Sequence, residues 1–212
     1  LIEYAIEYYK DLKKKFGEGR ERKTEIKVFD TISATNVIIA NRKLYVDVEE
    51  GFIGYGLKKT EPVNDCSEID DIILFFATGK MMVTRIADKK FVGKGIIHAD
   101  VWKKGDKRTI YHLIYQDGAG GAAMMKRFYV NSITRDTEYD LTRGTKGSKV
   151  LYFSVHPNGE REVVNVLLRP RPHLKRLRFD VDFASLLIKG RQSAGNRVTK
   201  EIVQKITQVI AR

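Results

Sequence analysis

The sequence predicts an all-β protein in which small antiparallel sheets repeat around a centre, as the blades of a propeller do. Short β-rich stretches alternate with turn signals, and four of them close on a loop that contains glycine and basic residues. These loops are Phe52–Lys59, Phe91–Gly95, Arg143–Gly147 and Gly190–Arg197. Their spacing of roughly 40 to 50 residues is in or near the range of propeller blades. Because one blade cannot bury its apolar face alone, we expect neighbouring four-stranded blades to stack into a disc with these loops on its rim.

A short helix is expected ahead of the sheets. In the first sixteen residues, Ile2, Ile6, Tyr9, Leu12 and Phe16 recur at helical spacing, and glycines follow directly. The next stretch is charged and has no period. We therefore predict a helix and linker over residues 1–26 and a β domain over residues 27–212.

Four hairpins are predicted from paired apolar runs with turn residues between them. The runs are 37–40 with 43–46 around Asn41-Arg42, 72–76 with 81–86 around Gly79, 111–115 with 124–130 across a glycine-rich loop, and 150–155 with 163–168 through His156–Gly159. Further on, apolar residues at 177, 179, 181 and 183 alternate with charged ones, which is typical of a strand with one wet face.

The charge of the chain indicates a polyanionic partner. Hydrophobic residues make up 42% of the sequence, enough for an ordinary core, while the net charge is +12 and the pI is about 9.6. Acidic residues outnumber basic ones up to residue 79, so the whole excess of positive charge lies further on. Such unevenness is expected of a binding face.

The apolar runs, such as residues 72–77, are far too short for a membrane-spanning helix, so we expect no membrane association. The single cysteine, Cys66, fits a reducing compartment, and we expect a cytoplasmic protein. Because Leu1 takes the place of an initiating methionine, we interpret the chain as a piece of something longer.

Duplex DNA is the polyanion that the basic loops fit best. Lysine and arginine side chains release condensed counterions when they neutralise phosphates, and neighbouring glycines let the backbone approach closely. The predicted DNA-contacting set is Lys58, Lys59, Lys94, Arg143, Lys146, Lys149, Arg191, Arg197 and Lys200.

Catalytic and metal sites are not expected. The histidines His98, His112, His156 and His173 have no metal-ligand spacing with one another or with Cys66. The glycine-rich loop at 117–123 lacks the Gly-Lys-Ser/Thr ending of a phosphate-binding loop, and the paired carboxylates have no partner base. We therefore predict no catalytic residue, no metal and no cofactor in this chain.

Several segments together resemble a known family. They are Arg22–Ile26 after the helix, Asp70–Phe76, Gly79-Lys80, Phe91–Gly95, Met125–Phe128, Thr134–Asp140 and Lys189–Ser193. In order and spacing they resemble the C-terminal domain of the A subunits of bacterial type IIA DNA topoisomerases, particularly those of the topoisomerase IV type. The resemblance covers nearly the whole chain.

This resemblance implies a partial β-pinwheel, a propeller-like disc whose blades exchange strands, with about four blades and a truncated end. It implies that residues 1–26 come from the end of the upstream breakage–reunion domain, which carries the catalytic tyrosine. The implied partners are double-stranded DNA, the remainder of the A polypeptide and the separate ATPase polypeptide, the B component of the holoenzyme. The implied parent is an ATP-dependent topoisomerase associated with the nucleoid, and the fragment itself would bend or wrap DNA without catalysing a reaction.

One motif separates the two branches of that family. Gyrase A domains carry a box of the form Gln-Arg-Arg-Gly-Gly-Lys-Gly, whereas the matching loop here, Gly51–Lys58, has apolar residues in place of the leading arginines. Gly54, Gly56 and Lys58 keep part of the spacing, and Gly190–Lys200 resembles a degenerate copy. The topoisomerase IV type is therefore preferred. The alternative is a propeller-like scaffold for protein partners; a hydrolase on a propeller would need convergent catalytic groups that the sequence does not display.

Overall fold

The computed structural model describes residues 2–19, 42–57 and 60–209, and the chain divides into two compact units, Leu1–Ile38 and Ile39–Arg212. The first contains the helix α1, Ile2–Phe16, as predicted. The predicted boundary between residues 26 and 27 lies outside the described residues and stays a prediction. In the part of the chain that is described, no helix combines the length and the apolar character needed to cross a bilayer.

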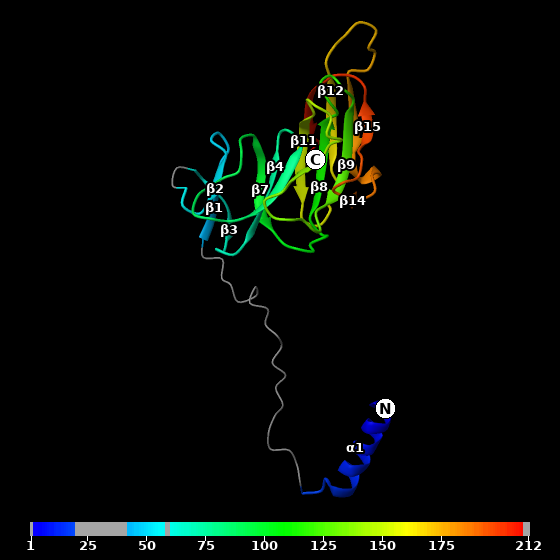
Figure 1. The fold of residues 1–212 in the computed structure, drawn as a ribbon. Coiled ribbons are helices and arrows are strands. Elements are labelled where there is room, and N and C mark those ends of the chain that lie inside the picture. Colours follow the sequence, from blue (N-terminus) through cyan, green and yellow to red (C-terminus); the bar gives the residue numbers. More distant parts are fainter. Residues whose placement is uncertain (1, 20–41, 58–59, 210–212) are drawn as a thin grey trace. The chain divides into compact units, whose positions relative to one another are not determined.

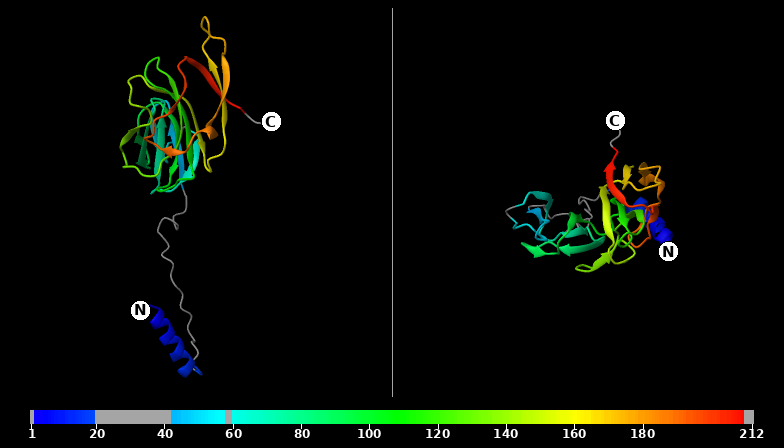
Figure 2. Two further views of the ribbon diagram at one scale, coloured as in Figure 1. Left: turned by 90° about the vertical axis from the view of Figure 1, so that its right-hand side faces the viewer. Right: turned by 90° about the horizontal axis from the view of Figure 1, so that it is seen from above.

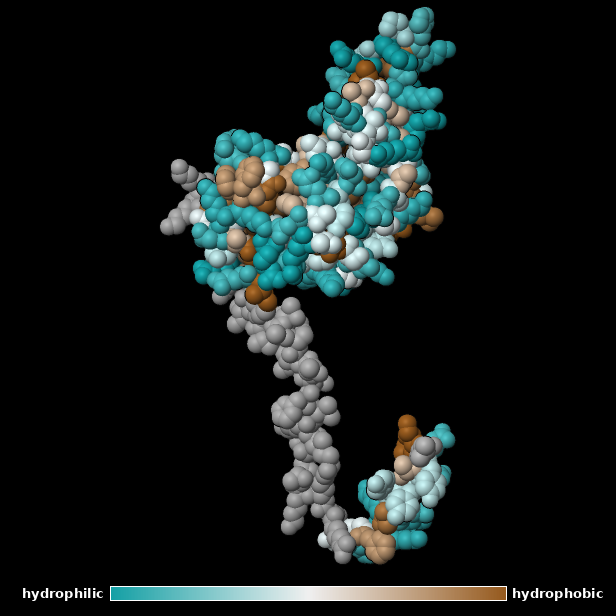
Figure 3. Space-filling view, viewed as in Figure 1, coloured by the Kyte–Doolittle hydropathy of each residue, from teal (hydrophilic) through white to brown (hydrophobic). Residues whose placement is uncertain are grey.

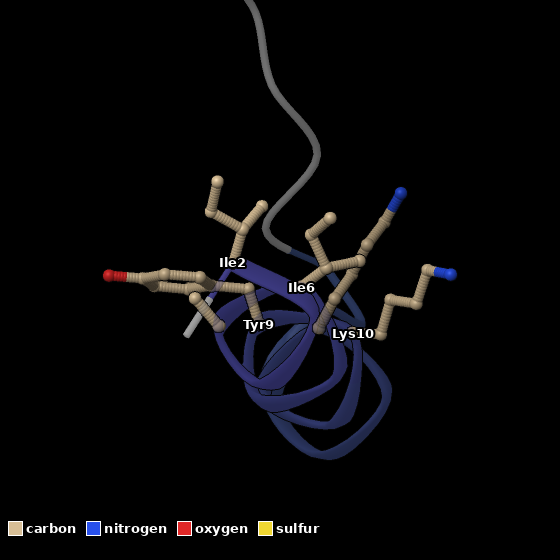
Figure 4. A pocket seen from close by; sticks show the side chains of 6 residues that line it. Ile2, Ile6, Tyr9 and Lys10 are labelled. Carbon is tan, nitrogen blue, oxygen red and sulfur yellow. The ribbon is translucent and has the colours of Figure 1, made fainter.

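Helix α1 has one apolar side and ends where the sequence predicts. The amide of Gly17 donates to the carbonyl of Lys13, 2.8 Å away, and closes the last turn. Figure 4 shows Ile2, Ile6 and Tyr9 beside one another over a shallow hollow, with Lys10 at its margin. None of the helix side chains described is buried, so this apolar side has no partner among residues 2–19.

The second unit is made of β-strands with one short 3₁₀ turn, η1, at Phe183–Ser185 (Figure 1). Its strands are β1 Arg42–Asp47, β2 Phe52–Gly54, β3 Pro62–Cys66, β4 Asp71–Phe76, β5 Lys80–Arg85, β6 Lys90–Phe91, β7 Ile96–Trp102, β8 Ile110–Gln116, β9 Ala123–Tyr129, β10 Glu138–Asp140, β11 Lys149–His156, β12 Val163–Leu168, β13 Arg178–Asp182, β14 Lys189–Gly190, β15 Asn196–Thr199 and β16 Val203–Gln208.

These strands form four sheets that share strands in a regular way. Their orders are β3-β1-β2-β6, β10-β5-β4-β7, β11-β8-β9 with β14 and β15, and β13-β12-β16. Each sheet starts from a hairpin. One edge is then completed by a strand that the chain makes only after the hairpin of the next sheet: β6 in the first, β10 in the second, β15 in the third. This exchange is the property that distinguishes a pinwheel from a propeller, and the predicted fold class is confirmed.

The sheets stack face to face, and strands β4 and β8 of the two middle sheets are buried on both sides. In β4, Ile72, Leu74 and Phe76 belong to the core shared with the first sheet. The alternate residues, Ile73 and Phe75, belong to the core shared with the third sheet. Successive side chains of a strand point to opposite faces, so an unbroken apolar run is what a strand between two sheets requires. Figure 1 shows the sheets following one another in chain order across the unit.

Strand β8 repeats this arrangement one sheet further on. Tyr111, Leu113 and Tyr115 face the second sheet, while Ile114 packs with Val164 and Phe183 of the fourth. Phe75 of β4 lies 4.8 Å from Tyr111 and 4.5 Å from Phe153, measured between ring centroids. This aromatic contact joins the two middle sheets, and Figure 2 shows them from two further sides.

Two of the four predicted hairpins are confirmed, β4 with β5 and β8 with β9. The pairing of residues 150–155 with 163–168 is wrong, because β11 pairs with β8 whereas β12 pairs with β13 and β16. The turn signal at His156–Gly159 is real, yet it starts a crossing between sheets. The turn placed at Asn41-Arg42 is wrong at Arg42, which lies in β1 opposite Cys66; residues 37–41 lie outside the described residues.

Candidate nucleic-acid interface

The hairpin turns lie at one end of the strands, together with the crossovers by which the chain returns from an exchanged strand to the next sheet; we call this the crossover end. It comprises the turns 48–51, 77–79, 117–122 and 169–177 and the crossovers 92–95, 141–148 and 200–202. Each crossover follows an exchanged strand, β6, β10 or β15, and leads into the next sheet through β7, β11 or β16. The antiparallel register places the end of each exchanged strand beside a hairpin turn: Phe91 opposite Phe52, and Asp140 opposite Lys80.

Hydrogen bonds join turns and crossovers alternately. The amide of Val92 donates to the carbonyl of Gly51 at 2.9 Å, and that of Ala77 donates to Gly95 at 2.8 Å. Further along, the amide of Leu141 donates to Gly79 at 2.8 Å. The hydroxyl of Thr145 donates to Asp117 at 2.8 Å. Hydrogen bonds thus connect the turns and crossovers continuously over the first three sheets.

Glycine permits the closest of these approaches. Gly51 has φ +77°, and a Cβ at this position would lie 2.5 Å from the carbonyl carbon and oxygen of Gly93. Turn 48–51 and crossover 92–95 therefore touch backbone to backbone, which holds Lys94 in place.

Five of the predicted DNA-contacting cations lie on the crossovers or directly after them: Lys94, Arg143, Lys146, Lys149 and Lys200. All five are exposed, as is Arg197 on β15. Two have acidic neighbours, with Lys94 3.5 Å from Glu50 and Arg143 3.9 Å from Asp117. The Lys94–Glu50 pair is open to solvent, and the Arg143–Asp117 pair is long and exposed on the arginine side. Both therefore contribute little to stability, and the cations stay available to a stronger anion.

Arg191 lies elsewhere. It follows β14, which runs parallel to β9, so the loop 191–195 precedes the exchanged strand instead of following it. The guanidinium of Arg191 lies 4.1 Å from the ring centroid of Tyr139. The fourth glycine loop is therefore not equivalent to the second and third, and the equivalent crossover is Lys200–Ile202. Lys58 and Lys59 lie outside the described residues.

A buried lysine supports the loop 191–195. Lys126 of β9 is 3% exposed, and its ammonium donates to the carbonyls of Arg191 at 2.7 Å and Ser193 at 3.4 Å. Burial lowers the pKa of this lysine to about 8. The polar hollow beside it, about 240 Å³, is lined also by Arg127 and Lys189. Because the ammonium of Lys126 already donates to two carbonyls of the loop 191–195, we interpret Lys126 as a residue that positions this loop.

A family model described as "Topoisomerase C-terminal domain, Bacteroidota" matches residues 43–210. The chain belongs to this topoisomerase C-terminal domain family. It is 24% identical over 204 residues to the A polypeptide of DNA topoisomerase 4 from Borreliella burgdorferi (strain ATCC 35210 / DSM 4680 / CIP 102532 / B31), an alignment that covers 96% of the chain and 31% of that protein. The chain thus spans about a third of the length of this curated relative.

Among solved structures, the crystal structure of the C-terminal domain of DNA topoisomerase IV aligns with 87% of this topoisomerase C-terminal domain and 64% of that chain. The TM-score is 0.44 and the sequence identity 12%.

A buried polar cluster, which spacing along the sequence does not reveal, lies between the third and fourth sheets of this topoisomerase C-terminal domain. His112 of β8 and Glu162 before β12 are 0% and 1% exposed in their side chains, and Nδ1 of His112 lies 2.8 Å from Oε2 of Glu162. Nε2 of His156 lies 3.2 Å from the same oxygen. Tyr152 and Ser154 both donate hydroxyls to Glu162.

These three residues, His112, His156 and Glu162, have the separations of a metal site, but the hydrogen bonds favour a closed network. Arg127 donates Nε–H to Nε2 of His112 at 3.1 Å, so the remaining ring proton is on Nδ1, where it is donated to Glu162. A metal at Nδ1 would require the opposite tautomer and a clash of protons with Arg127. The prediction that the chain holds no metal stays a prediction.

Burial lowers the pKa of His112 to about 4, although the hydrogen bond with Glu162 acts in the other direction. Hydrogen bonds from Ser154, Tyr152 and His112 lower the pKa of Glu162 against the effect of its burial. Both shifts describe a neutral imidazole beside a charged carboxylate.

We expect the protein to lose stability on acidification between about pH 6.5 and pH 4, in keeping with the lowered pKa of His112. Within this window the unfolded chain binds a proton at residue 112 that the folded chain excludes, so unfolding becomes more favourable as pH falls, by roughly 3 kcal/mol at the lower limit. Urea unfolding over this range measures the effect. His112→Asn should be less stable at pH 7 but show a flatter pH profile; an unchanged profile would contradict the assignment.

Gly51→Ala should destabilise the second unit by about 1 to 3 kcal/mol, because the new methyl group meets the backbone of Gly93. Gly120→Ala is the matched control: its φ is +74°, yet nothing lies within 4 Å of a Cβ there. Thermal unfolding of both variants separates the cost of the clash from that of the backbone conformation. Equal losses would show that turn and crossover do not touch as described.

Proposed function

We propose that this domain binds duplex DNA through the phosphate backbone, without sequence preference, and bends or wraps it along the crossover end. In the parent A polypeptide of an ATP-dependent type IIA topoisomerase it would present that DNA to the catalytic core and to the separate ATPase polypeptide. The chain itself would bind and not catalyse. One observation carries the proposal: the crossovers that strand exchange brings to one end of the sheets carry exposed cations, and in the first two crossovers these cations lie beside glycines.

Physical chemistry favours DNA for such an end. Lys94, Lys146 and Lys200 lie on three successive crossovers, one for each boundary between sheets. A series of flexible ammonium groups suits a row of phosphates, since neutralising each phosphate releases counterions and no base need be read. The family match to topoisomerase C-terminal domains supports the same partner.

A topoisomerase IV-type contact is preferred to gyrase-type wrapping. The residues that replace the leading arginines of the gyrase box lie in β2, where Ile53 is fully buried and Phe52 packs on Phe91 at 5.2 Å. Side chains in these positions serve the core of the first sheet. The 24% identity to the A polypeptide of a topoisomerase 4 agrees with this preference.

Binding of mixed-sequence duplex DNA should weaken linearly in a plot of log affinity against log salt. Lys146→Ala should make that slope shallower by about one, because one phosphate contact is lost. Lys103→Ala, an exposed lysine in the turn after β7 and away from the crossover end, is the matched control and should keep the slope. Fluorescence anisotropy at several salt concentrations measures both. Binding that is absent at low salt, or insensitive to salt, would instead favour a protein-binding scaffold.

Sealing nicked circular DNA over the bound protein should trap only a small change in linking number. A local bend without a full turn of wrapped DNA stores little writhe, whereas a gyrase-type wrap would leave a large positive shift. Gel separation of the topoisomers after removal of the protein gives the result. A large shift would overturn the preference for the topoisomerase IV type while leaving DNA binding intact.

A further inference from the structure

The most basic surface segment among the described residues lies outside the predicted DNA-contacting set, which came from the glycine loops. It is the turn between β12 and β13, residues 169–177, with the first residue of β13, Arg178; we call residues 169–178 the β12–β13 loop. Of residues 169–178, five are lysine or arginine and none is acidic. All five, Arg169, Arg171, Lys175, Arg176 and Arg178, are exposed. Figures 1 and 2 show this loop extending well beyond the sheet that bears it.

The β12–β13 loop differs in charge from the other hairpin turns at the crossover end. Turn 48–51 contains Glu49 and Glu50, and neither 77–79 nor 117–122 contains a basic residue. If positive charge served solubility alone, it would have no reason to concentrate in one turn of four. The space-filling view marks the same projection as largely hydrophilic (Figure 3).

The loop continues the line of the crossover end. Its first amide, that of Arg169, donates to the carbonyl of Ile202 at 2.8 Å. The guanidinium of Arg171 donates to Glu201 at 2.6 Å. Both partners belong to the crossover that carries Lys200, so the loop is attached directly to the third crossover. An anion that lies along the crossovers therefore meets the loop next.

The backbone of the loop is restrained, which favours binding. Pro170 and Pro172 fix the backbone angle φ at two positions in the first half of the loop. The amide of Leu174 donates to the carbonyl of Arg171 at 3.3 Å and closes a turn in which His173 has φ +69°. At the base, the amide of Leu168 donates to Leu177 at 2.8 Å. A restrained loop loses less conformational entropy when it binds.

Its cations are available. Among the residues that the structure describes, Arg169, Lys175, Arg176 and Arg178 have no carboxylate within ion-pair distance, and only Arg171 is paired. The loop also lacks the aromatic side chains that anchor most protein interfaces. Exposed, unpaired cations without an aromatic anchor match a phosphate backbone better than a protein surface.

We propose that the β12–β13 loop is a DNA-contacting arm that binds phosphates of the duplex beyond the third crossover. This inference rests on the proposed function and extends it, since it assigns part of the salt-dependent affinity to a hairpin turn and not to a crossover. The arm would hold the duplex at the fourth sheet, while Lys146 and Lys200 hold it at the second and third.

The double variant K175Q/R178Q tests the arm in the full 212-residue chain. Neither side chain makes an ion pair among the described residues, so the fold should tolerate the change. We expect weaker binding of mixed-sequence duplex DNA and a log–log salt slope shallower by about two. The charge-conserving variant K175R/R178K should bind like the unmodified chain. Thermal unfolding verifies that each variant folds.

The matched control is K103Q/K104Q, which removes the same charge from the turn after β7, away from the crossover end. If both double variants lose affinity equally, the loss reflects net charge alone and the arm is refuted.

If the unmodified chain binds DNA and K175Q/R178Q binds equally well, the arm is refuted while the proposed function stands. If the unmodified chain does not bind DNA at low salt, the proposed function itself fails. Loss of binding to polyglutamate, with DNA binding kept, would identify an acidic protein as the partner and overturn the proposal.

Discussion

The burial of β4 and β8 on both of their faces is the constraint on which the rest of the second unit depends. Each strand supplies alternate side chains to two different cores, so the strand is buried on both faces only when a sheet is present on each side of it. Two contacts show this two-sided burial. Phe75 packs on Tyr111 and Phe153 between the second and third sheets, and Ile114 packs with Phe183 on the side of the fourth sheet. Stacked sheets of this kind share their stability, and a single blade would expose an entire apolar face.

Strand exchange follows from this stacking and fixes where function can lie. An exchanged strand must leave its own blade, pair one sheet back and then return, and each return crosses at the end where the hairpin turns are. Glycines such as Gly51 allow the crossing chain to touch the turn below it. The fold thereby produces a row of crossovers along one end, and the residue types placed on them decide what that row binds.

Much of this could be predicted from the sequence, because strand alternation, turn residues and basic glycine loops are local signals. The hairpins β4–β5 and β8–β9, helix α1 and the all-β class belong to this group. Strand pairing over long sequence separations could not be predicted. Residues 150–155 and 163–168 have the pattern of a hairpin, but β11 pairs with β8 instead. For the same reason spacing could not reveal His112 with Glu162, which meet only when two sheets stack, nor that Arg191 precedes its exchanged strand whereas Lys94 and Lys146 follow theirs.

The distribution of charge along the crossover end gives it a direction. Near the first sheet, Glu49 and Glu50 offset Lys94, and at the next crossover Arg143 lies 3.9 Å from Asp117. In the β12–β13 loop, by contrast, only Arg171 of the five cations has a carboxylate within ion-pair distance among the described residues. A polyanion bound along this end would be held weakly at the first sheet and strongly at the fourth, because unpaired cations do not first have to give up an ion pair. The buried His112 network lies between the third and fourth sheets, so it supports the part of the unit to which the most basic surface is attached.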